Sequence, residues 1–432
     1  MFDTKLNMVV STAYLLQGVL ALAPDLPSTG QSTITANCTN DPDFAIWDAK
    51  AQEVQYACRV EPGDAAEVAR VLEIAVENQC QIAIKSGGHS TNRDASNSVG
   101  GVTIDLVRIN HVKLLDDHTQ ADFGPGLILR DAYASLQPYN LTNLGGRTAD
   151  VGLAGYTIGG GLTALAPKFG LALDNAYEYE IYTTNYTDEL IDQEYQLATT
   201  LSDDLDMCFH NRYYYNQSED SFGWNFYQEY SQPILNPSVF DALNQIPFLT
   251  DERRVDYASA LSLDEVSPHG LRRLYATVTF QPSRELHRKM IDMYTEEIES
   301  IKSIANLTTS LVGQALHINS IKAMGQRGGN ALGIESDGSL LIALLTLGWG
   351  NSEDDSAIYD FAQRWTDRSR SEAEARGLLH PWQYINCAAP FQDPFSSYGE
   401  ASKLRLQEIQ RNTDPAGIFT SQGLVRGSFK LL

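Results

Sequence analysis

Two glycine-rich segments constrain the fold of this 432-residue chain more than any other feature. The first, Ser86 to Ser90, directly follows the apolar run Ile82 to Ile84, and the second runs from Gly145 to Gly161. Because glycines lack a Cβ, backbone N–H groups there can approach a phosphate closely and form a concave anion site. A Gly-Gly-His-Ser sequence by itself is more typical of a tight turn with a surface histidine. The two segments together favour a nucleotide or flavin site.

Neither segment has the spacing of a common cofactor or catalytic motif. The dinucleotide pattern G-x-G-x-x-G is missing, and its nearest approach, Gly124-Pro125-Gly126, lacks the third glycine. The chain also has no Walker A, H-E-x-x-H, C-x-x-C or G-x-S-x-G sequence. The eight histidines show no metal-ligand spacing, so we expect no metal site. A cofactor site outside the common folds remains.

Charge and hydropathy exclude two classes of partner. Lys and Arg number 31 against 55 Asp and Glu, which gives a net charge of −24. Such an acidic surface repels phosphate backbones, so we expect no nucleic-acid partner. No run reaches the length of a membrane span, so we expect none.

The N-terminal residues 1–23 have the pattern of a signal peptide. Lys5 precedes an apolar run from Met8 to Ala23 that ends in Ala-Leu-Ala. The alternative is a buried N-terminal helix. Five Asn-x-Ser/Thr acceptors favour the signal peptide, and with it a glycoprotein that is secreted or stays in the lumen of the secretory pathway. The acceptors are Asn37, Asn140, Asn185, Asn216 and Asn306. Residues 24–50 read as a linker or tail.

Five cysteines cannot all pair with one another. Cys58 and Cys80 each begin an apolar extended run, and neighbouring parallel strands would start them side by side, so they are the expected pair. Cys38 and Cys208 are alternative partners, and Cys387 is expected to be a free thiol. In the other interpretation, all five cysteines are reduced and buried.

The chain divides into three parts by pattern. Residues 51–190 alternate between helix and strand: a helix capped by Asp64 with Glu67, strands at 82–84 and 101–106, a helix at 127–136 and a strand at 177–183. Residues 191–402 hold long helices, at 283–302 and 357–376, between long apolar runs at 274–280 and 340–349. A short helix at 403–413 and the turn 414–417 lie in the tail, residues 403–432. This pattern predicts an α+β fold whose second part is an antiparallel sheet backed by helices.

Four motifs, in order and spacing, resemble the berberine-bridge-enzyme-like FAD-linked oxidases. These are flavoproteins of the vanillyl-alcohol-oxidase type with a PCMH-type FAD-binding domain, and the chain is most similar to their fungal secondary-metabolism branch. The motifs are Gly87-Gly88-His89-Ser90 with the strand 101–106 after it, Val151-Gly152-x-x-Gly155-x-x-x-Gly159-Gly160-Gly161, Tyr384-x-Asn386, and Asp414-Pro415-x-Gly417-x-Phe419. The resemblance covers nearly the whole chain from Trp47 onward.

The resemblance implies an FAD-binding domain at 51–190, completed by the tail 403–432, and a substrate domain at 191–402. It implies a covalent bond between His89 and FAD. Thr148 stands where bicovalent members have a cysteine, so a single bond is expected. Val151 matches a position associated with oxygen access, where a small residue is similar to the oxidases. The implied cofactor-binding residues are Ser86, Gly87, Gly88, His89, Ser90, Thr148, Val151, Gly152, Gly155, Gly159, Gly160, Ile181 and Asn386.

The implied reaction is an oxidation. Tyr384 matches a tyrosine credited with assisting substrate deprotonation, and its alternative role is that of a half-buried strand aromatic. The expected function is an FAD-dependent oxidase that moves hydride from a small organic substrate to flavin N5, with molecular oxygen as acceptor. A flavin dehydrogenase or cyclase at the same site is the first alternative. Cys387 replaces the family's usual tyrosine.

One departure from the family pattern concerns the FAD-binding domain. After Asn185 the family continues with further strands and a helix, whereas this chain passes directly to the helical segment that begins near Tyr186. Some tens of residues are missing by comparison. A remodelled family member and a mis-spliced gene are the two explanations. The departure keeps open a further alternative, a degenerate ligand-binding relative without catalysis.

Overall fold

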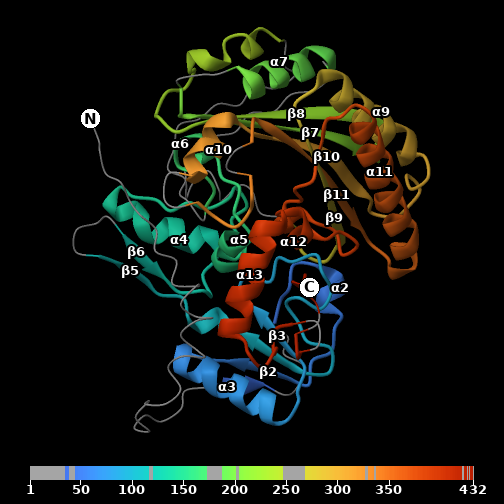
Figure 1. Cartoon of the computed structure of the whole chain (residues 1–432). Helices are drawn as coiled ribbons and strands as arrows, with labels where there is room; N and C mark the ends of the chain where they lie inside the picture. Colours follow the sequence, from blue (N-terminus) through green and yellow to red (C-terminus); the bar gives the residue numbers. More distant parts are fainter. Residues whose placement is uncertain are drawn as a thin grey trace.

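The computed structural model describes residues 35–37, 44–115, 120–172, 187–200, 204–246, 268–325, 329–334, 337–420, 423–425, 427 and 429–431. The expected signal peptide, Cys38 and the expected strand 177–183 with Ile181 lie outside these residues. A small sheet and a large sheet lie at opposite ends of the molecule, with the C-terminal helix beside the small sheet (Figure 1). The described residues include no helix long and apolar enough to cross a bilayer.

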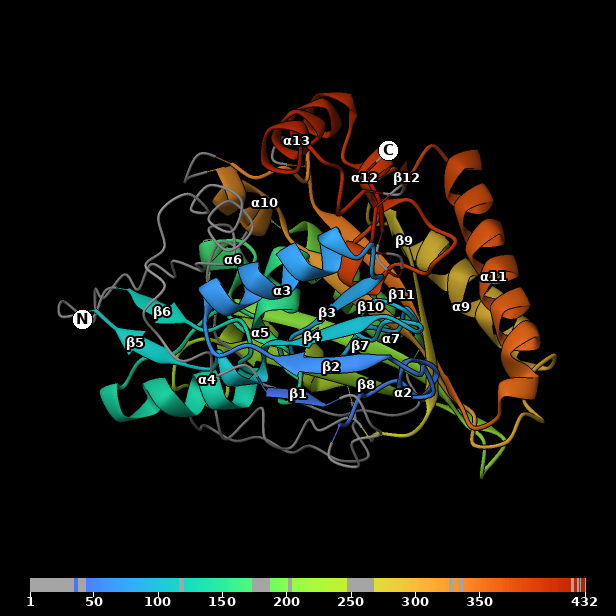
Figure 2. The same cartoon turned by 90° about the horizontal axis from the view of Figure 1, so that it is seen from below.

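The small sheet is built from four short strands in the order β1-β2-β4-β3. Strands β2 and β3 both pair in parallel with β4, and β1 pairs antiparallel with β2. Helix α3 covers one face of the sheet (Figure 2), where Val68 and Val71 pack on Ile104. The bounds are β1 Thr35–Asn37, β2 Cys58–Glu61, α3 Ala65–Glu77, β3 Ile82–Lys85 and β4 Val102–Asp105.

Helix α3 begins where the sequence predicts. The Asp64 carboxylate accepts a hydrogen bond from the backbone N–H of Glu67 at 2.8 Å. The Glu67 carboxylate in turn accepts one from the N–H of Gly63 at 2.7 Å. These side chains satisfy N–H groups that the first turn of a helix leaves unpaired.

The C-terminal tail packs on the small sheet. After helix α13 (Glu400–Thr413), both Asp414 carboxylate oxygens accept backbone N–H groups, from Ile418 and Phe419, at 2.8 Å each. The turn brings the chain to strand β3, where the N–H of Ile82 donates to the carbonyl of Leu424 at 2.9 Å. Residues far apart in the sequence therefore share one core.

The predicted Cys58–Cys80 disulfide is wrong. Cys58 is disulfide-bonded, but Cys80 is a free thiol, as are Cys208 and Cys387. The prediction assumed that the two extended runs are neighbouring strands. Instead β4 lies between β2 and β3, and two strand spacings of about 4.8 Å exceed the Cα separation that a disulfide tolerates.

A second layer follows the small sheet. Strands β5 (Val112–Leu114) and β6 (Ala121–Phe123) form a two-stranded hairpin, on which α4 (Leu129–Leu136) and α5 (Leu153–Ile158) pack. A lone hairpin is marginally stable in water, so the helices supply the buried face that it needs. Helix α6 (Ala166–Phe169) follows.

The large sheet has six strands in the order β12-β9-β11-β10-β7-β8, and every neighbouring pair is antiparallel. Helices α7, α9 and α11 cover one face (Figure 1). The α+β prediction is confirmed. The bounds are α7 Thr187–Thr199, β7 Met207–Asn216, β8 Ser221–Tyr230, β9 Arg272–Phe280, α9 Arg284–Ile298, β10 Thr308–Leu316, α10 Ile318–Met324, β11 Leu340–Trp349, α11 Asp355–Ala375, β12 Leu379–His380 and α12 Pro394–Ser397.

Side-chain alternation gives the large sheet two different faces. In β11, Leu341, Ala343 and Leu345 pack against the helical layer. The intervening residues, such as Ile342, face the other way and pack with Tyr384. The face opposite the helices is therefore the one turned toward the glycine-rich segments.

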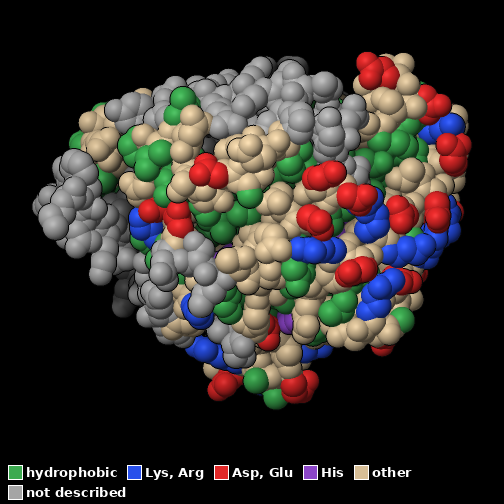
Figure 3. Space-filling model, turned by 90° about the horizontal axis from the view of Figure 1, so that it is seen from above, with side chains coloured by type: hydrophobic (Ala, Val, Ile, Leu, Met, Phe, Trp, Pro, Cys, Tyr) green, Lys and Arg blue, Asp and Glu red, His purple; other side chains and the backbone are tan. Residues whose placement is uncertain are grey.

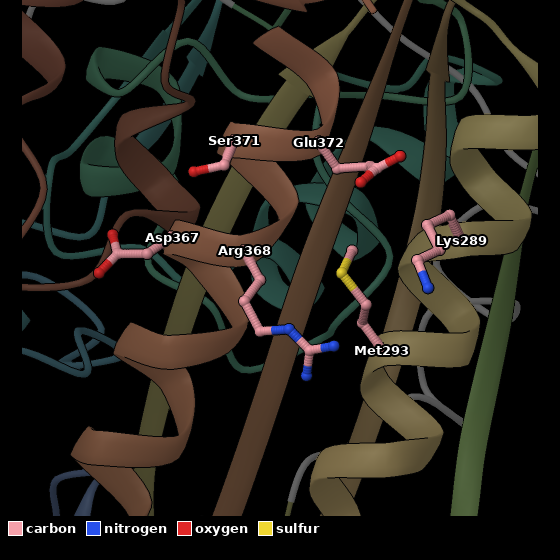
Figure 4. A pocket seen from close by; sticks show the side chains of 6 residues that line it. All are labelled: Lys289, Met293, Asp367, Arg368, Ser371 and Glu372. Carbon is pink, nitrogen blue, oxygen red and sulfur yellow. The ribbon is translucent and has the colours of Figure 1, made fainter. Parts of the chain in front are cut away.

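The outer surface of the helical layer carries interleaved charges (Figure 3). Arg368 on α11 pairs with Glu296 at 2.8 Å and with Glu297 at 2.7 Å, both on α9. Arg368 also lines a groove between the two helices, together with Lys289 and Met293 (Figure 4). The groove lies on the far side of the sheet from the glycine-rich segments.

Candidate cofactor site

The two glycine-rich segments meet backbone to backbone. A Cβ on Gly87 would lie 2.4 Å from the backbone nitrogen of Gly152, and a Cβ on Gly152 would lie 2.3 Å from that of Gly87. Ser86 ties the same loop to a third segment, because its Oγ donates to the carbonyl of Pro125 at 2.6 Å. Only glycine permits this contact at either position. The segments form one surface, as the sequence led us to expect of a shared site.

The loop from Ser86 to Ser90 keeps its backbone donors available. Gly88 has a φ of 75°, a left-handed conformation that favours glycine. Among the described residues, no hydrogen bond uses the backbone N–H of Gly87, Gly88 or Ser90 as its donor. Beside Gly155, at the start of α5, a Cβ would meet open space. Free N–H groups next to open space are what an anion nest requires.

His89 is held as a neutral, stacked imidazole. Its ring lies on Trp47 with the centroids 3.7 Å apart and the planes at 15°. The Nε2 atom is buried and has no hydrogen-bond partner in the part of the chain that the structure describes. Burial lowers the pKa of His89, although nearby Asp150 opposes this shift. The imidazole therefore keeps a lone pair at neutral pH.

The segment that carries Trp47 is anchored to the large sheet. Asp48 caps the short helix α2 (Ala49–Gln52) and pairs with Lys50 at 2.9 Å. The Asp48 carboxylate also accepts the backbone N–H of Arg273 on β9 at 3.1 Å. The guanidinium of Arg273 lies 4.2 Å from the centroid of the Trp47 ring. These contacts anchor the Trp47 ring that stacks on His89 to the large sheet.

Tyr384 and Asn386 contact the second glycine segment. The Tyr384 hydroxyl accepts the backbone N–H of Leu162 at 2.6 Å and the side-chain amide of Asn386 at 3.2 Å. That amide also donates to the carbonyl of Tyr156 at 2.9 Å. A Cβ on Gly159 would lie 1.7 Å from the Asn386 Oδ1 atom, so the position requires glycine. The third motif therefore lies against the second.

The electrostatics make Tyr384 a poor base in this structure. Burial raises the pKa of Tyr384 above its usual value, and it raises the pKa of the neighbouring Cys387 to about 12. The phenol is therefore neutral, and two donors already occupy its oxygen. Its own O–H remains to donate a hydrogen bond. The structure supports hydrogen-bond donation by Tyr384 rather than proton abstraction.

Other predicted residues lie near the same surface. The N–H of Val151 donates to the carbonyl of Thr148 at 3.3 Å, which closes a turn ahead of Gly152. Val151 is half-buried and packs with the core of α4 and α5. Gly160 has a φ of 108° and lies beside Tyr384. Ile181 lies outside the described residues, and its role stays a prediction.

A buried polar cluster was missed by sequence reasoning. Arg147, inside the second glycine segment, pairs with the fully buried Glu229 of β8 at 2.6 Å. His210 of β7 stacks on Tyr227 with the centroids 4.1 Å apart, and its Nδ1 lies 3.6 Å from Glu229. Because these residues come from a loop and two strands far apart in the sequence, spacing in the sequence gave no signal. Arg147 alone was detectable, as a charge within a glycine-rich run.

Comparison with known proteins identifies the ligand of this site. The family model described as an FAD binding domain matches residues 56–185. The match confirms FAD as the predicted cofactor. It spans both glycine segments and strands β2, β3 and β4 of the small sheet.

Curated relatives match most of the chain. An FAD-dependent monooxygenase of Cochliobolus heterostrophus is 26% identical over 451 aligned positions, which cover 89% of this chain and 87% of the relative. The bifunctional solanapyrone synthase of Alternaria solani is 25% identical, covering 87% of this chain and 82% of the relative. The first alignment is longer than the whole 432-residue chain, so it contains gaps.

Solved structures share the fold. The 6-hydroxy-D-nicotine oxidase of Arthrobacter nicotinovorans superposes with a TM-score of 0.70 at 15% identity, covering 94% of this chain and 100% of that one. A BBE-like protein of Physcomitrella patens gives a TM-score of 0.70 at 14% identity, covering 96% of this chain and 99% of that one. With the FAD-binding domain, these shared folds agree with the predicted resemblance to berberine-bridge-enzyme-like flavoproteins, and the FAD-dependent relatives confirm the predicted FAD-linked oxidoreductase.

The residues present fit FAD. The glycine loops offer unpaired backbone donors beside open space, suited to a pyrophosphate. His89, in the first of these loops, presents a neutral imidazole held in place by its stack on Trp47. Residues 86–90 and the turn at Gly152 would hold the cofactor, with Asn386 on the side of the large sheet.

Proposed function

We propose that this chain is an FAD-dependent oxidase of a small organic molecule, with the flavin bonded to His89. The observation that carries the proposal is His89 itself: a buried, neutral imidazole stacked on Trp47, in the loop packed against Gly152. A solved glucooligosaccharide oxidase of Acremonium strictum, a structural neighbour, is described as carrying an 8α-N1-histidyl and 6-S-cysteinyl FAD. Thr148 replaces the cysteine that bicovalent members use, so we propose the histidyl bond alone.

A flavin bound here would supply a hydride acceptor at N5 and pass the electrons to oxygen. The protein's part is to bind, orient and exclude water. Because two donors already point at the oxygen of Tyr384, its own O–H is left to donate to an oxygen or nitrogen of the substrate. The ion pair between Arg147 and Glu229 adds a fixed dipole at the same sheet face. The relatives from fungal pathways support a secondary-metabolite intermediate as the substrate.

The electron acceptor can be tested without knowing the substrate. The purified protein is reduced with dithionite under nitrogen, mixed with air-saturated buffer and followed at the flavin absorbance, with a peroxidase-coupled dye for hydrogen peroxide. An oxidase regains its colour within seconds and releases about one peroxide per flavin. Slow reoxidation would instead favour a dehydrogenase or cyclase. Rapid reoxidation without peroxide would contradict the simple oxidase.

Val151 provides the matched variant for this test. A larger side chain at this half-buried position narrows the approach to the flavin, so Val151→Leu should slow reoxidation while FAD content stays the same. Val239→Leu, a partly buried valine on the helical face of the large sheet, is the control. If Val151→Leu reoxidises as fast as the wild type, the position does not control oxygen access.

A further inference from the structure

Asp150, which is not one of the motif residues, lies between two histidines, the motif residue His89 and His269. Its Oδ1 lies 3.6 Å from Nε2 of His89, and its Oδ2 lies 3.3 Å from Nε2 of His269. Both carboxylate oxygens are buried and make no hydrogen bond within the described residues. His269 is half exposed at the protein surface, whereas the His89 side chain is only 14% exposed. The three residues therefore form an array that runs from the buried imidazole to solvent.

The fold holds each member of the array in place. Asp150 lies two residues before Gly152, and its carbonyl is 3.2 Å from where a Cβ on Gly87 would be. The contact between the glycine segments thus sets Asp150 beside His89. Arg273 donates from its guanidinium to the carbonyl of Pro268, which fixes the turn that carries His269. The stack on Trp47 fixes the plane of the His89 ring.

A carboxylate beside one nitrogen of a neutral imidazole favours the tautomer in which that nitrogen carries the proton. Asp150 faces Nε2 of His89, so the N–H lies at Nε2 and the lone pair at Nδ1. Burial would raise the pKa of Asp150, but His89 and His269 outweigh burial and lower it. Asp150 is therefore an anion at neutral pH, ready to accept a proton from His89. Arg273, which faces the same ring across Trp47, opposes a charge on the imidazole.

We propose that Asp150, with His269 behind it, is the base that enables His89 to form its covalent bond with FAD. This inference rests on the proposed function. The new bond joins Nδ1 of His89 to the 8α carbon of the flavin. A C–H bond at that carbon breaks, its proton leaves to solvent, and its electron pair reduces the ring, which takes up one proton. The Nε2 proton passes to Asp150 and leaves through His269. Molecular oxygen then reoxidises the ring and becomes hydrogen peroxide.

The rate of bond formation tests this role directly. Protein produced under riboflavin limitation is incubated with excess FAD in air, and samples are precipitated with acid at intervals. Flavin that stays in the pellet measures the bond, and flavin in the supernatant measures binding without it. We expect Asp150→Asn to slow bond formation by about a hundredfold, within the range of a positioned base. His269→Gln should slow it less, because Asp150 can still release its proton to water.

The chain offers a matched control. His111 and Asp122 form a similar pair at 3.3 Å on the β5–β6 hairpin, exposed and away from the site. Asp122→Asn should flavinylate at the wild-type rate. Asp150→Glu should recover part of the rate, since it restores the carboxylate.

The outcomes separate the two proposals. An Asp150→Asn protein that is yellow but releases its flavin into acid supports the role and shows that the variant folds and binds FAD. Covalent flavin formed at the wild-type rate in Asp150→Asn overturns the role and leaves the proposed oxidase intact. A wild-type protein that binds FAD but never retains it in acid overturns the role and the covalent bond together. A wild-type protein that binds no FAD overturns the proposed function.

Discussion

The contact between Gly87 and Gly152 predicts a large effect from a single methyl group. Gly152 has ordinary extended dihedral angles, φ −66° and ψ 123°, that alanine adopts without strain. The cost of Gly152→Ala therefore comes only from the contact. Its Cβ would lie 2.3 Å from the backbone nitrogen and 2.9 Å from the Cα of Gly87, and 2.7 Å from Oγ of Ser86. Because backbone atoms cannot rotate away, one of the two loops must shift.

Overpacking of this kind costs about 1–3 kcal/mol, and we expect the upper part of that range because the neighbour is backbone. In a domain of 150–250 residues, each kcal/mol lowers the thermal midpoint by about 2–4 °C. Gly152→Ala should therefore lower the midpoint of the flavin-binding domain by at least about 4 °C. The FAD content of the purified protein should fall as well.

Differential scanning fluorimetry and the flavin absorbance measure both effects. Gly338→Ala is the control, because a Cβ at that exposed loop position meets open space. It should change the midpoint by less than about 2 °C, because surface substitutions usually change stability by no more than about 0.5 kcal/mol. If Gly152→Ala kept the wild-type midpoint and full FAD content, the two glycine segments would not pack as described.

Three further results are expected. Glu229→Gln removes the buried partner of Arg147 and should lower the free energy of unfolding, measured with denaturant, by about 3–5 kcal/mol. The same change at the exposed Glu296 should lower it by less than about 1 kcal/mol. Equal losses would contradict the burial of the first pair. Burial and nearby arginines hold the pKa of His210 well below 6.5 in the folded protein, so only the unfolded chain takes up a proton there as the pH falls below 6.5, and stability should drop by up to about 1.4 kcal/mol per pH unit. His210→Gln should flatten this dependence of stability on pH between pH 7 and 5. An unchanged slope would rule out His210 as its source. We also propose that the protein passes through the secretory pathway, which the disulfide at Cys58 favours. Treating protein from a fungal host with peptide-N-glycosidase should then increase the mobility of the protein on a gel. Asn140→Gln should reduce that mobility shift.

Regular elements with strong patterns were predictable. The run Leu340–Trp349 is a strand with those bounds, and the helix predicted at 283–302 is Arg284–Ile298 with Ser283 as its N-cap. Local capping and apolar periodicity decide such elements, so no tertiary information is needed. The β7–β8 hairpin was not predicted. Its strands are rich in aromatic and polar residues on both faces, because one face packs on helices and the other lines the buried site.

Long-range pairing was harder to predict. The order of the small sheet places β4 between β2 and β3, and no local pattern specifies that insertion. The wrong disulfide follows from this one error. In the site, the glycine segments, His89, Tyr384 and Asn386 were found because motifs mark them. His269, His210 and Glu229 were not, because only the fold brings them to the site, and Asp150 lies in a glycine segment but outside its motif.

The central claim is that this chain holds FAD through His89. Acid precipitation of the purified wild-type protein and of His89→Ala, followed by visible spectra of pellet and supernatant, tests it most directly. The account predicts yellow colour in the wild-type pellet and, for His89→Ala, colour only in the supernatant. Yellow pellets from both proteins would place the bond elsewhere, and a colourless wild-type protein would contradict the flavoenzyme itself.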